Sequence, residues 1–367
     1  MKIILKQIVL LFIIALAVFV IVDKDSFLYS QPVGLITQVK EVSQTATKDD
    51  FNNQDKQITQ EVTIKILNGH EKNQETTIDN QVAQSQVTGQ VYQRGQKVLL
   101  GKSNGQYNIL TQKRDALVAG LITLFIGLCL IFMRRRSTIM LALSLMLNLG
   151  FFVSAVIMQV DFSSLNIILV FSLLAMIFAI VSLLFTLGKT RQMFYTLMTT
   201  LLSVGITFLI VLGILGLTGN SGIHFEYMNY VSHDPRYFFY VGAIISVLGA
   251  IMDGTGDIVA GMFGVHRQNQ VQHYVMIEKE YFKSGLSIGQ EIIGTLINVL
   301  FMIFMAETFP IAILLLRNNN NWSYIGTIAL NLGLLQTLIS AIGIVIAIPV
   351  TAGFVSIMFG KSKKEVV

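Results

Sequence analysis

Long apolar runs separated by short polar loops make up most of this chain. A helix needs about 20 residues to cross the hydrocarbon core of a bilayer. Runs of that order occupy residues 1–22, 116–133, 138–160, 165–187, 193–217, 237–265, 288–306 and 325–357. The pattern therefore predicts an α-helical polytopic membrane protein with about eight transmembrane helices.

The first run has two interpretations. It begins with Lys2 and Lys6 and continues as an apolar stretch, as signal peptides and uncleaved anchors both do. In a signal peptide the small residues of the cleavage site follow the apolar stretch. Here the small residues Ala15 and Ala17 lie in its middle, with five further apolar residues after them. We therefore favour a membrane anchor over residues 1–22, with a signal peptide as the alternative.

Residues 23–113 are polar and follow a different pattern. Residues 61–67 alternate apolar and polar positions, Asn68-Gly69 is a turn signal, and residues 75–78 resume the extended pattern. Three further short apolar or alternating segments cover residues 33–42, 96–100 and 107–110. Short strands at this spacing predict a small β-barrel or sandwich. Residues 43–60, rich in Thr, Asp, Asn and Gln, are predicted to form a mobile loop.

Two apolar stretches fit the helix pattern less well. The segment from Pro310 to Leu316 is too short to span, so a re-entrant turn or an interfacial segment is expected there. The last run is longer than a bilayer requires and contains Pro349, which is expected to kink it or to divide it into two helices.

Composition agrees with a membrane protein. The chain is 53% hydrophobic and 13% charged, whereas about 25% of residues are charged in an average soluble domain. The net charge is +5, but the basic residues flank apolar runs and do not gather on one face, so nucleic acid is not an expected partner. The single cysteine, Cys129, excludes an intrachain disulfide.

The distribution of basic residues predicts the orientation. Short cytoplasmic loops of membrane proteins are enriched in Lys and Arg. With residue 1 inside the cell, the short outer loops contain only two basic residues, Arg236 and Arg317. The basic residues of the inner loops and of the two chain ends are Lys2, Lys6, Arg134, Arg135, Arg136, Lys189, Arg191, Arg267, Lys279, Lys283, Lys361, Lys363 and Lys364. We therefore expect a multi-pass membrane protein with both termini in the cytoplasm. Its predicted parts are the anchor at 1–22, an outer β-rich domain at 23–113, a seven-helix domain at 114–360 and a basic tail at 361–367.

Acidic residues within the apolar runs are the candidate functional groups. Asp253 and Asp257 interrupt one run, and Glu291 and Glu307 lie near the ends of the next. Carboxylates are expensive in hydrocarbon, so such residues face other helices or a water-filled cavity and indicate a functional site. Asp253 and Asp257 are four residues apart and therefore share one helix face. We expect Asp253, Asp257 and Glu291 to form a proton or cation relay, with Thr295 and Asn298 as supporting polar groups.

Small residues on the same helix indicate close packing. Ser246, Ala250 and Gly254 recur every four residues, and Gly249 and Gly261 extend the stripe of the aspartates. The structural alternative for the acids is that they reach the inner interface and pair with basic residues, namely Arg267, Lys279 or Lys283. For Glu291, near its helix N-terminus, the helix dipole would be sufficient.

Other chemistry is less well supported. His224, Glu226, His233 and Asp234 lie in one loop, but their spacing matches no closed metal-ligand pattern, so a solvated loop is favoured over a metal site. His266 and His273 are expected to be solvated. The chain shows no set of nucleophile, base and orienting residue. We therefore expect no enzyme, no metal and no cofactor.

Several motifs are similar to those of a known family. The stretches are GAIMDGTGDI from Gly249, SGLSIGQEIIGTLINVLFM from Ser284, the following Pro310, and AIGIVIAIPVTAG from Ala341. With the strand pattern of the insert, they resemble the YibE/F family of bacterial multi-pass membrane proteins over essentially the whole chain. The resemblance implies this architecture, with a location in the bacterial cell membrane, and no particular reaction.

The order of parts also resembles one half of a resistance-nodulation-division or SecD/SecF-type proton-driven protein, an analogy of architecture only. The first functional hypothesis is a transporter or export-associated protein that uses the carboxylates as a relay. The alternative is a non-transporting scaffold or assembly factor whose β-domain binds an envelope partner. Besides the lipid bilayer, the expected partner is a companion subunit or a second copy, because half of a pseudo-symmetric transporter requires another half.

Overall fold

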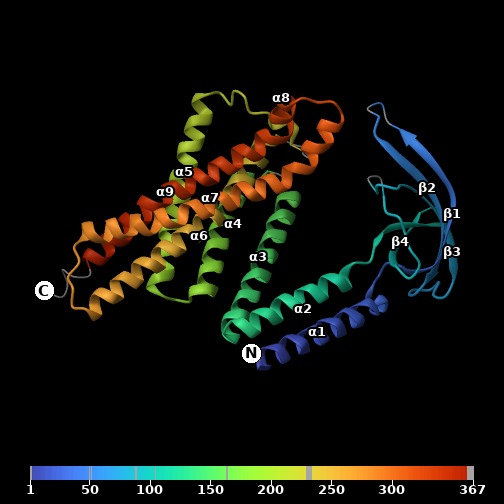
Figure 1. Cartoon of the computed structure of the whole chain (residues 1–367), viewed down its shortest axis with the longest axis horizontal. Coiled ribbons are helices and arrows are strands. Elements are labelled where there is room, and N and C mark those ends of the chain that lie inside the picture. Colours follow the sequence, from blue (N-terminus) through green and yellow to red (C-terminus); the bar gives the residue numbers. More distant parts are fainter. Residues whose placement is uncertain are drawn as a thin grey trace. The chain divides into compact units, whose positions relative to one another are not determined.

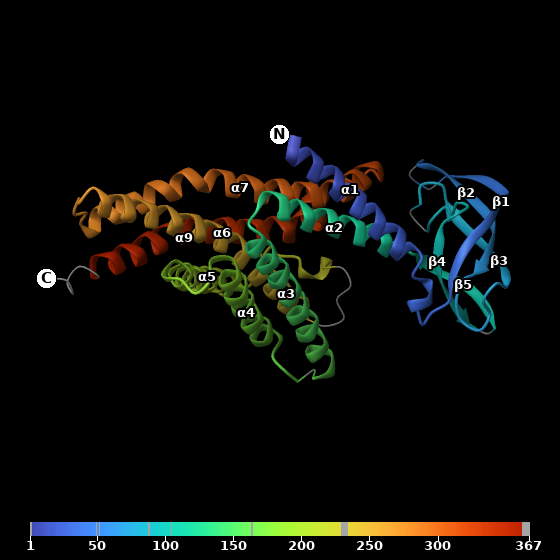
Figure 2. The same cartoon turned by 90° about the horizontal axis from the view of Figure 1, so that it is seen from below.

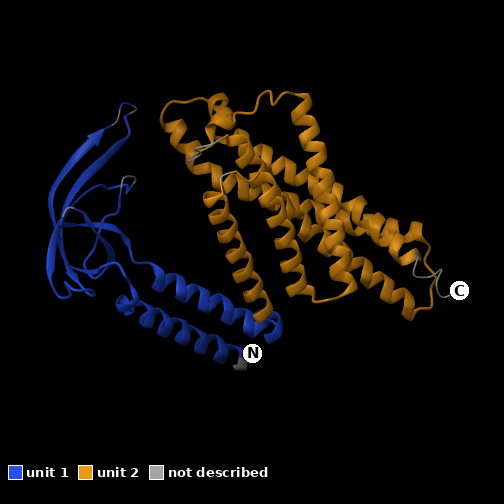
Figure 3. Ribbon diagram, turned by 180° about the vertical axis from the view of Figure 1, so that it is seen from behind, with its two compact units in different colours: residues 1–138 blue, residues 139–367 orange. Residues whose placement is uncertain are grey.

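The computed structural model describes residues 2–48, 50, 52–86, 89–103, 105–162, 164–228 and 234–361 of the chain (Figure 1). It forms two compact units, residues 1–138 and 139–367, which are coloured separately in Figure 3. The first unit holds two helices and a sheet, and the second holds a bundle of helices. Each unit is described by itself.

The two helices of the first unit pack against each other. They are α1 (Lys2–Asp23) and α2 (Asp115–Phe132). A Cβ atom added to Gly127 of α2 would lie 2.0 Å from the Cδ1 atom of Leu11 in α1. Only glycine allows this approach, so the contact depends on the absence of a side chain. Most of the remaining surface of both helices is apolar and exposed.

A five-stranded antiparallel sheet lies between these helices in the chain. Its strands are β1 (Val33–Lys48), β2 (Gln54–Ile66), β3 (Glu75–Ala83), β4 (Lys97–Ser103) and β5 (Gln106–Gln112), in the spatial order β3-β2-β1-β4-β5 (Figure 2). A short 3₁₀ turn (Ser26–Leu28) precedes β1. Alternate residues of β2 enter a core that comprises Ile36, Val62, Ile64, Ile66, Tyr92, Val98 and Leu100. The predicted small β-domain is confirmed.

The loop prediction for residues 43–60 is wrong. Residues 43–48 continue β1 and residues 54–60 belong to β2, so that the hairpin is longer than expected. The paired register extends from Gly34 opposite Ile66 to Lys48 opposite Gln54. The polar composition concealed these strands because much of this part of the hairpin is exposed, so that backbone pairing and not an apolar core holds it extended.

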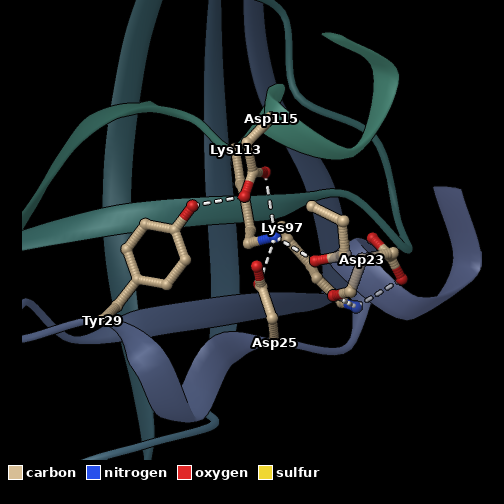
Figure 4. A network of polar contacts seen from close by, with 7 residues as sticks. Asp23, Asp25, Tyr29, Lys97, Lys113 and Asp115 are labelled. Atoms are coloured by element: carbon tan, nitrogen blue, oxygen red, sulfur yellow. Dashed lines mark hydrogen bonds and ion pairs between the residues drawn. The ribbon is translucent and has the colours of Figure 1, made fainter. Parts of the chain in front are cut away.

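Charged side chains join the base of the sheet to both helices (Figure 4). Lys113, which follows β5 and whose side chain is 1% exposed, contacts Asp25 at 2.8 Å and Asp115 at 2.9 Å. Its ammonium group also donates to the carbonyl oxygen of Val22 at 2.7 Å. Lys97 of β4 contacts the carboxylate of Asp23 at 2.5 Å. The hydroxyl of Tyr29 donates to Asp115. These contacts tie the end of α1, the start of α2 and two strands together.

The second unit is a helical bundle. Its long helices are α3 (Arg135–Asp161), which begins in the first unit, α4 (Ile167–Leu187), α5 (Arg191–Leu217), α6 (Pro235–Val271), α7 (Glu278–Arg317) and α9 (Asn331–Lys361). Short turns are η2 (Phe225–Tyr227), α8 (Trp322–Ile325) and the π-helical η3 (Gly326–Leu330). Side chains of Asn166, Thr190 and Asp234 cap the N-termini of α4, α5 and α6. Helix α6 contacts α4, α5, α7 and α9 and is the centre of the bundle.

Within the described residues, eight helical segments are long and apolar enough to span a membrane, as the hydropathy pattern predicts. The segment from Pro310 to Leu316 is neither re-entrant nor separate, because it continues α7 as far as Arg317. Likewise α9 runs through Pro349 as one helix to Lys361. Proline removes one backbone donor, and packing on both sides of it maintains the helix. The basic tail beyond Lys361 lies outside the described residues.

Candidate functional site

Helix α6 buries one side and exposes an acidic stripe on another. Val247, Ile251 and Ile258 are at most 2% exposed and pack against neighbouring helices. The exposed stripe consists of Gly249, Asp253, Asp257 and Ala260. Asp253 is the central residue of this 37-residue helix. Two carboxylates thus lie open to the surroundings of the bundle in the middle of a membrane-length helix.

A second polar stripe follows α7. Glu291, Thr295 and Asn298 are exposed on this helix. Its opposite side packs tightly against α9, since a Cβ added to Gly289 would lie 2.5 Å from Ile348. Thr295 donates its hydroxyl proton to the carbonyl oxygen of Ile292 at 2.7 Å. The oxygen of that hydroxyl remains able to accept a hydrogen bond.

The contacts between α6 and α7 place the two stripes side by side. A Cβ added to Gly254 would meet Leu296 at 3.3 Å, and one added to Gly261 would meet Ile288 at 3.0 Å. This antiparallel register puts residues 253–257 at the level of about residues 293–297. Successive residues of an α-helix are rotated by about 100° about the helix axis. Asp253 and Glu291 are each about one such step away from the residue position that faces the other helix, so each side chain leaves its helix at about 100° to that facing direction. Because the helices are antiparallel, both side chains lie on the same side of the pair.

We call this surface the acidic face: it comprises Gly249, Asp253, Asp257, Ala260, Glu291, Thr295 and Asn298. Among the described residues, no basic side chain forms an ion pair with its three carboxylates. The structural alternative, in which Arg267, Lys279 or Lys283 neutralises them, therefore has no such contact in this part of the chain. Each carboxylate of the acidic face can accept a proton, although within the described structure the three do not form a group that could hold a metal ion.

The small residues of α6 are in different surroundings. Gly254 and Gly261 admit side chains of α7, and Ser246 places its hydroxyl oxygen 3.3 Å from that of Ser340 in α9. Ala250 is half-buried. Gly249 is exposed, and an added Cβ would meet nothing within 4 Å. The close contacts of this helix within the bundle thus leave the Gly249 side open.

Buried hydroxyls line the opposite side of α6, a feature that the sequence analysis missed. Five hydroxyl side chains of α5 are 0% exposed: Thr196, Thr199, Thr200, Ser203 and Thr207. The hydroxyl oxygens of Thr200 and Thr255 lie 2.7 Å apart. The hydroxyls of Thr196, Ser203 and Thr351 have no hydrogen-bond partner within the described residues. The spacing of three and four residues between the α5 hydroxyls is the sequence signal that could have revealed this row.

The histidines belong to other local contacts. His224 pairs with Glu226 at 2.7 Å, while Asp234 caps α6 and contacts Arg236 at 2.5 Å. His233 lies outside the described residues. Over the described parts of the chain, no group of three or more His, Cys, Asp or Glu side chains could hold a metal ion.

The expectation for His266 needs correction. His266 is half-buried: its Nδ1 lies 2.8 Å from the hydroxyl of Tyr281, and its ring stacks on Phe359 at a centroid distance of 4.3 Å. The ring contacts join the ends of α6, α7 and α9. His273 is exposed, as expected, and has a positive φ of 55°.

Fold and acidic face together define an α-helical membrane-embedded protein with an attached antiparallel sheet. The chain belongs to the YibE/F-like protein family, whose model matches residues 121–361. The model of the YibE/F family N-terminal domain matches residues 27–113, which include the sheet. Searches of curated proteins and of solved structures find no match.

Proposed function

We propose that this chain is a transporter or an export-associated protein in which Asp253, Asp257 and Glu291 carry a proton or another cation. The observation behind this proposal is their arrangement on one side of the α6–α7 pair, near the middle of α6 and without a basic partner in the described chain. Ionisable groups at such depth are costly and typically belong to ion or proton pathways. A purely structural role would not require three of them.

The acidic face requires a cover in the membrane. Direct contact of carboxylates with lipid chains is unfavourable, so polar groups face water-filled cavities or other proteins. A companion subunit or a second copy, placed against α6 and α7, would enclose a polar path along these residues. Gly249 on this face and Gly294 next to Thr295 on α7 leave room for such a neighbour because a Cβ atom added to either would meet nothing within 4 Å.

Ion flux into liposomes tests the proposal. The protein, extracted with its native neighbours in polymer-bounded discs, is fused with liposomes that carry a pH-sensitive dye, and a proton or cation gradient is imposed. We expect flux with the wild type and at least a tenfold loss with Asp253→Asn/Asp257→Asn. The matched control is Glu307→Gln, which removes a carboxylate 16 residues beyond Glu291 on α7 and should retain flux.

Both proteins must be equally folded for the comparison. Gel filtration and the thermal midpoint in detergent provide this check. Flux that persists in the folded double mutant would contradict the relay, and so would the absence of flux from wild-type discs that contain the co-extracted neighbours.

A scaffold role is the second candidate function. In it, the sheet domain binds an envelope partner and the acids serve helix association only. The observation that favours it is the edge of β1, which extends well past β4 and has no partner strand there among the described residues. Under this alternative, substitutions in the sheet would abolish binding of the envelope partner, and the variant Asp253→Asn/Asp257→Asn would still bind it.

A further inference from the structure

In the part of the sheet that the structure describes, strand β1 has an open edge over most of its length. It pairs with β2 from Gly34 to Lys48, but with β4 only at residues 33–35. In the described part of the sheet, no strand lies beside residues 37–48 on the β4 side, and Figure 1 shows β1 and β2 continuing past β4. An unpaired edge presents backbone donors and acceptors to any strand that can reach it.

The pairing shows which backbone groups are available. Ile66 of β2 bonds through its N–H and carbonyl to the β3 side, so the alternating residues 65, 61 and 57 face β1. Their partners Leu35, Lys40 and Thr45 use their backbone groups in the β1–β2 ladder. Gln38 and Ser43 do the same, so that their neighbours Val39, Glu41, Gln44 and Ala46 direct N–H and C=O away from β2.

A groove lies along the first part of this edge. It has a volume of about 780 Å³ and is bounded on one side by residues 37–39 and Glu41, and on the other by residues 91–94, with Gln60 between them. Gln60, which is 2% exposed, holds the far wall in place: its Oε1 accepts from the Tyr92 N–H at 3.0 Å, and its Nε2 donates to the Tyr92 carbonyl at 3.2 Å. Asn80 fixes the same wall by donating to the Gln90 carbonyl at 2.9 Å. The groove is thus preformed.

We propose that this edge and groove bind an extended segment of another polypeptide, which adds to β1 as a further strand. Backbone hydrogen bonds from Val39 and Glu41 would supply affinity, and alternate side chains of the segment would enter the groove. Glu41 and Arg94 border the groove and form no ion pair with a described side chain. A basic residue facing Glu41 and an acidic residue facing Arg94 match this lining.

The irregularity of β1 favours a short, specific partner over self-association. Bulges interrupt its register between Ile36 and Gln38 and between Glu41 and Ser43. Bulges and lysines on an edge oppose indiscriminate pairing, and Lys40 and Lys48 are both on this strand. The second bulge ends the regular spacing beyond Glu41, so the added strand is limited to a few residues beside the groove. The inference concerns the sheet alone and is independent of the relay.

Peptide selection on the full chain tests the inference. A phage-displayed library of random ten-residue peptides is selected on the protein in lipid nanodiscs, with counter-selection on the variant Glu41→Pro. Proline removes the outward N–H and is tolerated on an edge strand. The matched control is Glu41→Ala, which removes the carboxylate and keeps the N–H. We expect a selected peptide to lose at least tenfold in affinity on Glu41→Pro and less than threefold on Glu41→Ala.

Amide hydrogen exchange provides the second measurement. Peptide binding should slow exchange at Val39 and Glu41, while the amide of Val62 in β2 should exchange equally slowly in the wild type and in Glu41→Pro if the variant is folded. The variant Asp253→Asn/Asp257→Asn should bind the peptide as well as the wild type does, which separates this result from the test of the relay.

Three outcomes would overturn the inference. One is the failure of the library to yield a peptide that prefers the wild type to Glu41→Pro. Another is equal binding to Glu41→Pro and Glu41→Ala. The third is slow exchange at Val39 and Glu41 in a peptide-free dimer, which would show that a second copy occupies the edge.

Discussion

Thr200 of α5 and Thr255 of α6 hold their hydroxyl oxygens 2.7 Å apart, and both side chains are fully buried. This is a hydrogen bond between two helices of membrane length. Such bonds contribute less than their isolation from water suggests, because the separated helices find other partners in the membrane. Thr255 itself has an alternative, since its hydroxyl also lies 3.2 Å from the carbonyl oxygen of Met252.

The variant Thr200→Val should therefore destabilise the bundle modestly. Valine keeps the shape and removes the hydroxyl, so we expect a loss of about 0.6 to 2 kcal/mol in the free energy of unfolding. Reversible unfolding in mixed detergent measures it. The control Thr218→Val removes an exposed hydroxyl that bonds only within its own helix end. An equal loss in both variants would contradict a specific contribution from the interhelical bond.

Glycines of α7 should differ strongly in their tolerance of alanine. A Cβ at Gly285 would lie 2.8 Å from the Cβ of Ala352 and 2.8 Å from the sulfur of Met262. We expect Gly285→Ala to cost about 1 to 3 kcal/mol through overpacking. Gly294→Ala, on the same helix with open space around it, should be neutral or stabilise by up to about 1 kcal/mol through helix propensity. Thermal midpoints of the two purified variants compare them, and a larger loss for Gly294→Ala would refute the packing described for α7.

The acidic face should react with a lipid-soluble carbodiimide. Dicyclohexylcarbodiimide attacks protonated carboxyl groups that it can reach from hydrocarbon, and Asp253 and Asp257 are exposed on the side of α6 that other helices of the bundle leave open. We expect mass spectrometry of protein that is labelled after extraction into detergent, which removes a covering neighbour, to find the adduct on the fragment that contains these residues. Labelling should disappear in Asp253→Asn/Asp257→Asn. A wild-type fragment that stays unmodified after extraction into detergent would argue against this exposure.

Alkaline pH should weaken the base of the sheet. Burial, together with the hydrogen bond to Asp115, raises the pKa of Tyr29 from 10.0 to about 12. Burial alone would lower the pKa of Lys113, but the contacts with Asp25 and Asp115 outweigh it and raise this pKa above 10.5. Both groups thus favour the folded state fully below about pH 10, and this contribution is lost as pH rises through the folded values.

The variant Tyr29→Phe isolates the tyrosine. At pH 8 it should be less stable than the wild type by about 1 kcal/mol, the typical contribution of one hydrogen bond. Between pH 10 and 12 the difference should shrink, because only the wild type has a tyrosine to deprotonate at this position. Unfolding midpoints of both proteins across this range measure the gap, and a constant gap would show that Tyr29 does not titrate with folding.

Local patterns in the sequence predicted the helices and named the polar residues of the acidic face, but they did not give the geometry that brings the two stripes together. Apolar runs identify spans because each must satisfy its own backbone in lipid, and spacing alone places Asp253 and Asp257 on one face. The position of Glu291 beside them depends on the rotation of α7 about its axis. That rotation follows from contacts such as Gly254 with Leu296, which no single segment encodes.

The sheet shows the opposite limitation. Residues 61–67 alternate clearly because one face of β2 is buried, and this second half of the strand was predicted, whereas its first half was expected to be a loop. The outer part of the β1–β2 hairpin has no such pattern, since residues 41–48 are exposed along their length. Its Thr, Val and Ile residues favour extended backbone, but their polar neighbours gave the stronger and misleading signal. Polarity indicates exposure and does not by itself indicate disorder.

The ion pairs of Lys113 bring the two ends of the sheet domain to one place. Lys113 directly follows β5, the last strand of the sheet in the chain. It contacts Asp25, which precedes β1, the first strand, and its ammonium group donates to the carbonyl oxygen of Val22 at the end of α1. The chain therefore enters and leaves the sheet at adjacent points. The sheet domain is therefore an insertion between two neighbouring helix ends. A short turn in place of residues 26–112 would leave α1 and α2 as a helical hairpin. A different folded domain could be inserted at the same place without lengthening either helix.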